Sequence, residues 1–494
     1  MTPSTYQKAV FDFIQNGNGS AIISAVAGSG KTTTIVAAAK LIPSDKKVLM
    51  LAFNKSIADE LANRVKLPNI ECKTMHSVGF AALRTVKRYV NVDNNKTRKA
   101  VDGFVDYYNV KPEEIPGFNT IYRIISLGKN SGIGIITPNC EESWVEICEN
   151  HAVFQDDDSV DVSTIAKACV EILNHSNNSM GSSIDFDDMI YLPLLANARF
   201  GSYDFVFVDE AQDMSSLNRM ILKKLLKSDG RLIAVGDPHQ AIYGFRGADS
   251  ESMAKIQSEF NCITLPLSVS YRCAKSIVAE ARNSVCHILP SDSAPEGSVT
   301  SLGSYSPADF GSKDAIICRN IAPLVSMAYS LINNGVPAVM LGTDIGKGLV
   351  TLIGTISGKK KMTVSDFADK LEKWSSNRIQ TLEQKGDEKA ISILNDKVEC
   401  IKIFIKNSNS QNLSDLTSTI EKFFGESKGN CITLCTSHKS KGLEWDKVFI
   451  LDRSKFNPSW VKMAWMKEQE NNIVYVSVTR AKNNLVYIES NSWK

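Results

Sequence analysis

A glycine-rich stretch at residues 25–32, Ala-Val-Ala-Gly-Ser-Gly-Lys-Thr, constrains this chain more than any other part of its sequence. The apolar run 21–26 predicts a buried strand that enters the stretch, and residues 32–41 predict a helix that leaves it. Strand, tight loop and helix in this order form a P-loop pattern, in which Ala25 stands where the general pattern has its first glycine.

The residue types in this loop suit the binding of phosphate. Gly28 and Gly30 let the backbone turn tightly and bring its N–H groups close to an anion. The N-terminus of the helix adds partial positive charge and free donors. Lys31 can reach the β- and γ-phosphates, and the hydroxyl of Thr32 suits Mg²⁺. The loop therefore predicts a nucleoside triphosphate site, and the alternative is a glycine-rich turn that binds nothing.

Length and composition limit the class of protein. The 494 residues exceed a single hydrophobic core, so we expect two or more domains, and the net charge of +2 makes any nucleic-acid surface a local one. No apolar run approaches the roughly 18–20 residues that cross a bilayer, and residues 1–7 do not resemble a signal peptide. Eleven cysteines without a C-x-x-C pair predict reduced thiols. We therefore expect a cytoplasmic protein (host cytoplasm for a viral protein) that is neither secreted nor bound to membranes.

Strand and helix patterns alternate around the P-loop. The predicted elements are a short helix from Tyr6, strands at 48–53, 205–208 and 232–235, and a helix at 55–65. Near-continuous apolar strands alternating with helices predict a parallel sheet covered on both faces. Ligands of such sheets bind beyond the C-terminal ends of the strands, where Lys31, Asp209 and Asp237 fall.

Residues 79–180 show a helical period without a strand–helix repeat, so we expect a helical subdomain inserted into the first sheet domain. The early part of this segment is basic. Its basic residues are Arg84, Lys87, Arg88, Lys96, Arg98 and Lys99. Their charge fits either a solvated helix face or a contact with DNA.

A second strand–helix series begins near residue 260 and carries no P-loop. Its predicted strands are 263–267, 315–318, 338–341, 432–435, 448–451 and 485–488. A charged, helix-rich stretch at 343–428 interrupts the series. The predicted fold class is α/β, with two parallel-sheet domains that each hold a mainly helical insertion.

Two adjacent carboxylates follow the predicted strand 205–208. Asp209 can hold Mg²⁺, directly or through water, opposite Thr32. Glu210 can orient and deprotonate the water that attacks a γ-phosphate. The alternative is a solvated acidic turn, and a buried strand that runs directly into the acids argues against it.

The run 235–248, Val-Gly-Asp-Pro-His-Gln-Ala-Ile-Tyr-Gly-Phe-Arg-Gly-Ala, resembles motif III of the superfamily 1 helicases of the UvrD/Rep type. The other segments that resemble this family are 25–32 (motif I), 51–55 (Ia), 74–77 (Ib), 185–188 (before motif II), 207–213 (II), 267–272 (IV), 433–445 (V) and 474–482 (VI). They follow the order of the family over nearly the whole chain. The resemblance implies RecA-like domains at 1–78 with 181–258 and at 259–345 with 429–494, and insertions at 79–180 and 346–428.

The resemblance also implies an ATP site. From the first domain, Ala27, Gly28, Ser29, Gly30, Lys31, Thr32 and Thr33 would bind the nucleotide, Gln7 an adenine edge and Gln240 the γ-phosphate. From the second, Tyr271 would stack on adenine, Glu444 would contact the ribose, and Arg272 and Arg480 would reach the γ-phosphate. The alternative for each arginine is a salt bridge within its own domain. Thr33 stands where relatives often have an arginine, which leaves one face of the adenine without its usual partner.

A path for single-stranded DNA is the second implication. Phe53, Tyr243, Phe245 and Trp445 are the candidates for stacking on bases of any sequence. Asn54, Thr74, His76 and His438 are the candidates for contacts with DNA phosphates. Tyr243 and Trp445 fit the hydrophobic core equally well, and a polar surface is the alternative for the two histidines.

These assignments predict an ATP- and Mg²⁺-dependent helicase that moves 3′→5′ along single-stranded DNA and unwinds duplex at junctions, the polarity coming from the resemblance alone. We expect a monomer that works with single-strand-binding, replication or repair proteins. The second insertion is shorter than in well-known relatives and little chain follows motif VI, so a strand-separating hairpin is expected to be absent or supplied elsewhere. The alternatives are a translocase that displaces bound proteins with little unwinding, and a nucleotide-dependent DNA-binding switch or loader.

Overall fold

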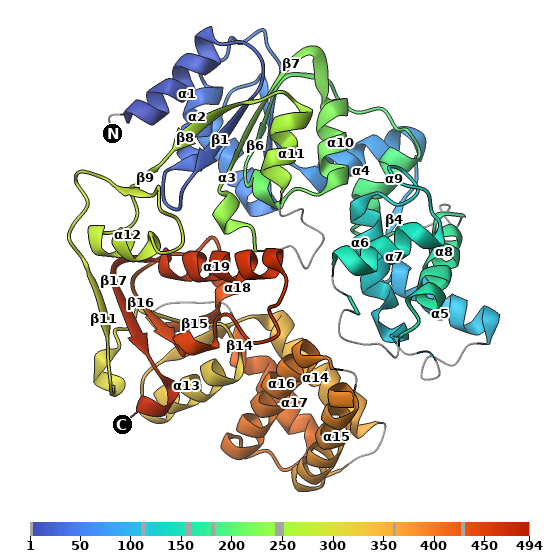
Figure 1. The fold of residues 1–494 in the computed structure, drawn as a ribbon, viewed down its shortest axis with the longest axis vertical. Coiled ribbons are helices and arrows are strands. Elements are labelled where there is room, and N and C mark those ends of the chain that lie inside the picture. The colour runs from blue at the N-terminus through green and yellow to red at the C-terminus, as the bar shows by residue number, and fades with distance from the viewer. Residues whose placement is uncertain are drawn as a thin grey trace. The chain divides into compact units, whose positions relative to one another are not determined.

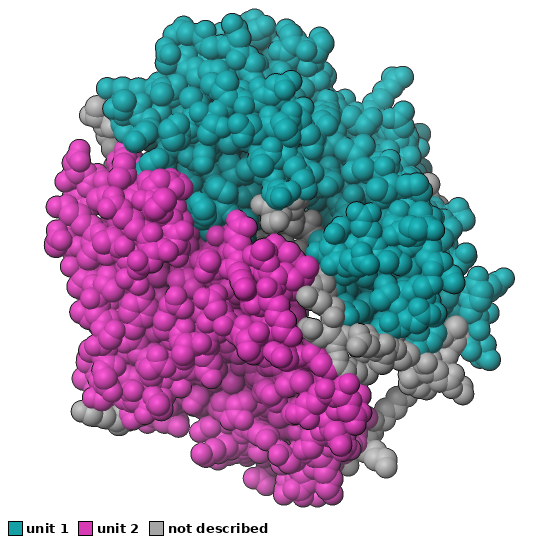
Figure 2. All heavy atoms as spheres, viewed as in Figure 1, with its two compact units in different colours: residues 1–268 teal, residues 269–494 magenta. Residues whose placement is uncertain are grey.

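The computed structural model describes residues 3–109, 115, 117–151, 153–154, 160–178, 183–242, 251–358, 362–384, 386–425 and 430–493. The chain divides into two compact units, residues 1–268 and 269–494, which have different colours in Figure 2. Each unit contains its own parallel sheet. None of the described helices is long and apolar enough to cross a membrane. All eleven cysteines are free thiols.

The first unit is built on a six-stranded parallel sheet with the order β3-β2-β6-β7-β1-β8 (Figure 1). Its strands are β1 (Ala21–Ala25), β2 (Val48–Ala52), β3 (Ile70–Thr74), β6 (Tyr203–Val208), β7 (Leu226–Gly236) and β8 (Ile263–Leu267). The inner strands β1, β2 and β6 are almost wholly buried, as apolar parallel strands covered on both faces should be. The predicted α/β class is confirmed.

Helices cover both faces of this sheet. They are α1 (Thr5–Asn16), α2 (Lys31–Ala39), α3 (Lys55–Val65), α10 (Ser216–Leu225) and α11 (Ser252–Glu259). Side chains alternate along β1, so Ile23 packs in one core with α1, α2 and α3, whereas Ile22 packs in another with α10 and α11. Short 3₁₀ turns, η3 (Ala211–Asp213) and η4 (Pro238–Gln240), follow β6 and β7 at the end of the sheet that carries the P-loop.

The segment between β3 and β6 is mainly helical, as predicted. Its elements are α4 (Met75–Val86), β4 (Asn91–Val92), α5 (Lys96–Tyr108), η2 (Phe118–Thr120), α6 (Ile121–Ser131), α7 (Glu141–Asn150), α8 (Val162–Asn178), β5 (Ser183–Ile184) and α9 (Asp188–Leu195). The strands β4 and β5 form a small parallel pair that the sequence did not predict. The apolar side chains of these helices share one hydrophobic core with a face of the sheet, so the segment is packed onto the sheet domain.

For Lys96, one of the six residues of the basic segment, both interpretations are wrong. Its side chain is 5 % exposed, and Nζ lies 2.7 Å from Oδ2 of Asp188. Lys129, equally buried, lies 2.8 Å from Asp188 and 3.2 Å from Asp185. A buried ammonium needs paired carboxylates to offset its desolvation, so Lys96 is part of an internal ion network and neither solvated nor exposed to DNA.

The second unit is built on a seven-stranded parallel sheet with the order β11-β17-β16-β12-β15-β13-β14. Its strands are β11 (Ser298–Ser301), β12 (Ala315–Cys318), β13 (Ala338–Leu341), β14 (Phe424–Gly425), β15 (Ile432–Thr436), β16 (Trp445–Leu451) and β17 (Ala481–Ile488). A separate pair, β9 (Val269–Ser270) and β10 (Leu289–Pro290), precedes it. The other elements are α12 (Lys275–Ala281), α13 (Ala322–Asn333), α14 (Thr343–Ser357), α15 (Val364–Gln384), α16 (Glu388–Asn407), α17 (Leu413–Phe423), α18 (Ser437–Ser440) and α19 (Ala464–Val478), with 3₁₀ turns η6 (Pro307–Asp309), η7 (Arg453–Lys455) and η8 (Ser490–Ser492).

The assignment of 263–267 to the second sheet is wrong. This segment is β8, and it pairs in parallel with β1, so that Ala21 lies opposite Ile263 and Ala25 opposite Leu267. Without β8, β1 would be an edge strand with unpaired N–H and C=O groups directly before the P-loop. The first sheet therefore ends one strand later than the sequence predicted.

Candidate functional site

The P-loop leads from β1 into α2 with its backbone open to an anion. Gly28 and Gly30 have φ values of 72° and 77°, in the left-handed region that favours glycine. Gly30 is the N-cap residue of α2, and no described side chain caps this helix. The hydroxyl of Ser29 is buried without a hydrogen-bond partner among the described residues. Free N–H groups at a helix N-terminus together with an orphaned buried donor fit a phosphate group.

A hydrogen bond joins the P-loop to the acidic end of β6. Thr32 Oγ1 donates to Asp209 Oδ2 over 2.9 Å. Asp209 is buried, and this burial, followed by the charge of Glu210, raises its pKa to about 6 against the opposing effect of Lys31. A hydroxyl beside a buried carboxylate supplies the oxygen ligands that Mg²⁺ prefers.

Glu210 is positioned by a residue that the sequence did not single out. Gln212 is buried, and its Nε2 donates to Glu210 Oε2 while its Oε1 accepts from the backbone N–H of Asp237 over 3.1 Å. The close approach needs a glycine at 236, because a Cβ there would lie 2.5 Å from Gln212 Oε1. Gln212 thus links the acids after β6 to the turn after β7.

Gln240 and Gln7 lie beside this centre with their amides already engaged. Gln240 is buried and donates from Nε2 to Asp237 Oδ2 over 2.7 Å. Burial raises the pKa of Asp237, against the charge of Lys31. Gln7 accepts from the Ser4 N–H in a capping box of α1 and donates to Thr34 Oγ1 over 3.0 Å. The Ser-x-x-Gln spacing was the available signal for this capping role.

Two of the predicted ATP-site residues of the second unit, Arg272 and Glu444, form an ion pair. Arg272 lies 2.6 Å from Glu444 and donates to the Thr479 carbonyl over 3.3 Å. Lys482 lies 2.7 Å from the other oxygen of Glu444. Burial raises the pKa of Glu444, but the Lys482 hydrogen bond and the Arg272 charge outweigh it and lower that pKa. Tyr271 is 41 % exposed.

Arg480 is 1 % exposed, and its guanidinium binds main-chain oxygens of the same unit. Nε donates to the Val476 carbonyl over 2.8 Å and Nη1 to the Leu443 carbonyl over 3.0 Å. In this structure Arg480 therefore makes internal contacts with main-chain carbonyls of its own unit.

Two candidates for DNA contacts in the first unit cap helices. Asn54 accepts from the Ile57 N–H at the start of α3, and Thr74 accepts from the Ser77 N–H at the start of α4. These cap positions use the side-chain oxygens and leave the donors of both residues for other contacts. Phe53, just before α3, is 48 % exposed.

His76 stacks on Phe186, with ring centroids 3.8 Å apart. Burial lowers the pKa of His76 to about 4, so the ring is neutral at pH 7 and contacts a phosphate only as a neutral donor. A cavity of about 80 Å³ is lined by Phe53, His76, Asp209 and Glu210 among others. The structure therefore brings the predicted DNA and nucleotide residues of this unit close together.

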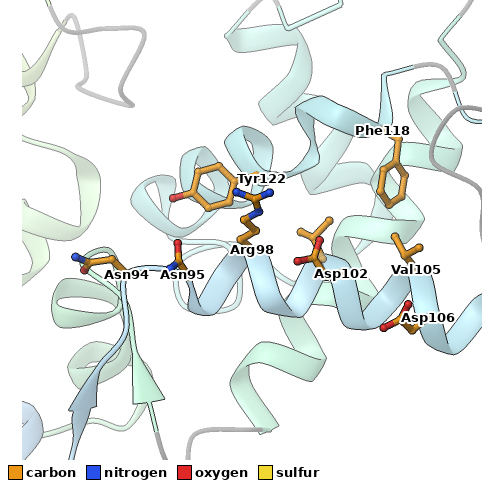
Figure 3. A pocket seen from close by; sticks show the side chains of 9 residues that line it. Asn94, Asn95, Arg98, Asp102, Val105, Asp106, Phe118 and Tyr122 are labelled. Atoms are coloured by element: carbon orange, nitrogen blue, oxygen red, sulfur yellow. The ribbon is translucent and has the colours of Figure 1, made fainter. Parts of the chain in front are cut away.

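The remaining DNA candidates lie elsewhere in the chain or outside the described residues. Tyr243 and Phe245 lie outside the described residues. His438 lies in the short helix α18, and Trp445 is the partly buried first residue of β16. Arg98, from the basic segment, and Tyr122 line a pocket of about 700 Å³ along α5. Figure 3 shows their side chains.

Comparison with known families matches residues 6–261 to the UvrD/REP helicase N-terminal domain. The chain belongs to the UvrD/REP helicase family. A second match, to the UvrD-like helicase C-terminal domain, covers residues 305–492. The first match lies within the unit 1–268 and the second within the unit 269–494. The family resemblance drawn from the motifs is thus confirmed.

Individual relatives are distant but extend over the chain. F-box DNA helicase protein 1 of Schizosaccharomyces pombe is 24% identical over 94% of this chain and 55% of its own length. F-box DNA helicase 1 of Gallus gallus is 24% identical over 95% of this chain and 47% of its own length. The ATP-dependent DNA helicase PcrA of Leuconostoc citreum is 24% identical over 56% of this chain and 38% of its own length. The chain spans about half the length of the first two UvrD/REP relatives.

Proposed function

We propose that this chain is a DNA-dependent ATPase that moves 3′→5′ along single-stranded DNA and unwinds duplex DNA. The observation that carries the proposal is the 2.9 Å hydrogen bond between Thr32 and Asp209, which joins the P-loop to the acidic end of β6. Membership of the UvrD/REP helicase family supports the coupling of this ATP hydrolysis to DNA. Relatives that carry the name DNA helicase support the substrate class.

Each residue of the first unit has a defined part in the proposed hydrolysis. The N–H groups of the P-loop and Lys31 bind the β- and γ-phosphates. Thr32 and Asp209 hold Mg²⁺, which when bound neutralises charge on the phosphate oxygens. Glu210, oriented by Gln212, accepts a proton from the attacking water. Gln240, anchored on Asp237, senses the γ-phosphate.

The roles of the second unit's residues are inferred from the family resemblance. We assign Arg272 and Arg480 to the γ-phosphate, Glu444 to the ribose and Tyr271 to adenine stacking. In this role Arg480 exchanges its neutral carbonyl partners for phosphate oxygens, a change favoured because phosphate is an anion that arginine can bind bidentately. The RecA-like domains and helical insertions keep the ranges given above, except that β8 belongs to the first sheet.

The test combines two assays on the full chain. ATP hydrolysis is measured against increasing single-stranded DNA, and strand displacement is then compared on duplexes with 3′ or 5′ single-stranded tails. We expect DNA to stimulate hydrolysis and only the 3′-tailed duplex to be unwound. Hydrolysis without DNA stimulation favours the nucleotide-dependent switch or loader. Stimulated hydrolysis that removes a bound protein without separating strands favours the protein-displacing translocase.

The same proposal covers the setting of the enzyme. We expect a monomer that acts at single-strand/double-strand junctions in the cytoplasm, together with single-strand-binding, replication or repair proteins. Sedimentation with and without DNA tests the monomer directly, and a stable dimer in the active complex contradicts it.

A further inference from the structure

Two side chains from other elements hold the first turn of α2, directly after the P-loop. Gln7 of α1 donates from Nε2 to Thr34 Oγ1 over 3.0 Å. Arg64, in the last turn of α3, donates from Nη2 to Thr33 Oγ1 over 3.0 Å. An amide and a guanidinium therefore flank the turn that follows the phosphate-binding loop.

The guanidinium of Arg64 is held by its edge. Nη1 lies 3.3 Å from Oε1 of Glu60, one helical turn earlier, and Nη2 binds Thr33. Both contacts use N–H groups in the plane of the guanidinium, and the side chain is 34 % exposed. A planar cation fixed in this way offers a face on which an aromatic ring can stack.

The position of Arg64 relates it to the base of a bound nucleotide. In the proposed ATP site the β- and γ-phosphates lie at the P-loop, and we place the ribose and base beside the first turn of α2. Gln7 offers polar groups to the edge of a base there. Thr33 is exposed, short and branched, so it gives no flat surface, whereas Arg64 on top of it does.

We propose that Arg64 stacks on the nucleobase of bound ATP and gives the site a preference for purines. The proposal rests on the proposed ATP site and adds a residue from α3, outside the P-loop helix, that determines which base the site accepts. Position 33, where relatives often have an arginine, holds a threonine in this chain. Arg64 supplies a planar cation there instead and is tied to Thr33 by a hydrogen bond.

The test measures equilibrium binding of ATP, UTP and inorganic tripolyphosphate, each with Mg²⁺, to the wild-type chain and to Arg64→Ala. We expect the substitution to raise the Kd of ATP about fivefold, to raise that of UTP less, and to leave that of tripolyphosphate unchanged. Tripolyphosphate has no base, so its unchanged affinity also shows that the site is folded. Equal losses for ATP and tripolyphosphate, or no loss for either, overturn the role of Arg64.

Two further variants separate stacking from charge. Arg64→Lys keeps the charge without the planar face, so it is expected to match Arg64→Ala, and full ATP affinity in Arg64→Lys contradicts the proposal. Glu60→Ala removes one of the two contacts that hold the guanidinium and keeps the planar face, so ATP affinity is expected to fall by less than in Arg64→Ala. A wild-type chain that binds neither ATP nor tripolyphosphate would instead refute the proposed ATP site itself.

Discussion

The two units contain the same strand–loop–helix junction in two different states. In the first unit β1 leads into α2, and no described side chain caps the helix. In the second unit β12 leads into α13, and Asp396 of α16 fills the helix N-terminus. Its carboxylate accepts from the Ile321 N–H over 2.9 and 3.1 Å and from the Ala322 N–H over 2.8 Å.

The basic residues beside the two junctions, Lys31 and Arg319, also differ in whether a carboxylate pairs with them. Lys31 forms no ion pair with any described residue, although its charge acts on the buried Asp209 and Asp237. Arg319, which follows β12, binds Glu470 through three contacts of 2.8–3.3 Å. One junction is left open to an external anion and the other is closed by a carboxylate of the protein. The fold supplies the helix N-terminus twice, and the side chains around it decide whether a ligand can use it.

The largest effect is expected at the open junction. Lys31→Ala should lower ATP hydrolysis by about 10²–10³-fold, because it removes a cation from the developing phosphate charge. Binding of single-stranded DNA should change little, as measured by fluorescence anisotropy. The matched control is Lys40→Ala, at the other end of α2, which should keep wild-type hydrolysis. Unfolding of the first unit in Lys31→Ala would make the lysine structural and remove the contrast with Arg319.

The buried carboxylate of Asp209, beside the open junction, is expected to lower the free energy of unfolding of the first unit. The folded pKa of Asp209 is raised by burial to about 6, so the folded state binds a proton more readily than the unfolded state does. Stability therefore falls as pH rises from about 4 to about 6. Asp209→Asn should stabilise the first unit at pH 7 by on the order of 3 kcal/mol, since the pKa rises from 3.8 to about 6 and one pKa unit corresponds to about 1.4 kcal/mol.

Hydrogen exchange of β1, α2 and β6 peptides at pH 5 and pH 8, without nucleotide or metal, measures this difference. It reports each unit separately, which global unfolding of a two-unit chain does not. The gain from Asp209→Asn should be larger at pH 8 than at pH 5, where the folded Asp209 is mostly protonated. A gain that is equal at every pH would show that the buried charge is not its source.

At the closed junction, removing a carboxylate should lower the stability of the unit, whereas at the open junction it should raise it. Asp396→Ala removes the acceptor of three N–H contacts and is expected to destabilise the second unit by about 1 kcal/mol, the usual cost of losing a helix cap. Exchange of α13 amides should speed up while that of α2 stays unchanged. Asp396→Asn keeps an acceptor and should lose less. An unchanged α13 in Asp396→Ala would mean that the cap contributes nothing and that the two junctions differ only in appearance.

The sequence predicts the open junction better than the closed one, because the residues that form the closed junction lie far apart along the chain. Strand, glycines and lysine of the P-loop are adjacent, so the bounds of β1 and α2 follow within two residues of the prediction. Asp396 lies 75 residues from Ile321, and nothing local marks it as a cap. The pair of Lys96 and Asp188 spans 92 residues, so nothing local in the basic segment showed that Lys96, unlike the exposed Arg98 and Lys99, is buried.

The sheet that a strand joins is equally non-local. Residues 263–267 are correctly predicted as a strand, but an apolar run does not show which free edge it will pair with, and β8 joined β1. Other features were readable. Asn54 and Thr74 precede their helices in ordinary cap positions, and weighing that spacing against the family resemblance would have predicted both structural contacts.

The smallest expected effect is that of sulfate on amide exchange, which can be measured at both junctions in one experiment. Sulfate should slow exchange of α2 amides in the wild-type chain, because the open helix N-terminus binds an anion, and should leave α13 unchanged, because Asp396 already occupies that place. At a sulfate concentration equal to its Kd the stabilisation is about 0.4 kcal/mol. In Asp396→Ala the α13 amides should become sensitive to sulfate as well, with sodium chloride at matched ionic strength as the control. If α13 stays insensitive after its carboxylate is removed, the difference between the junctions lies in the backbone around them and not in the side chain that closes one of them.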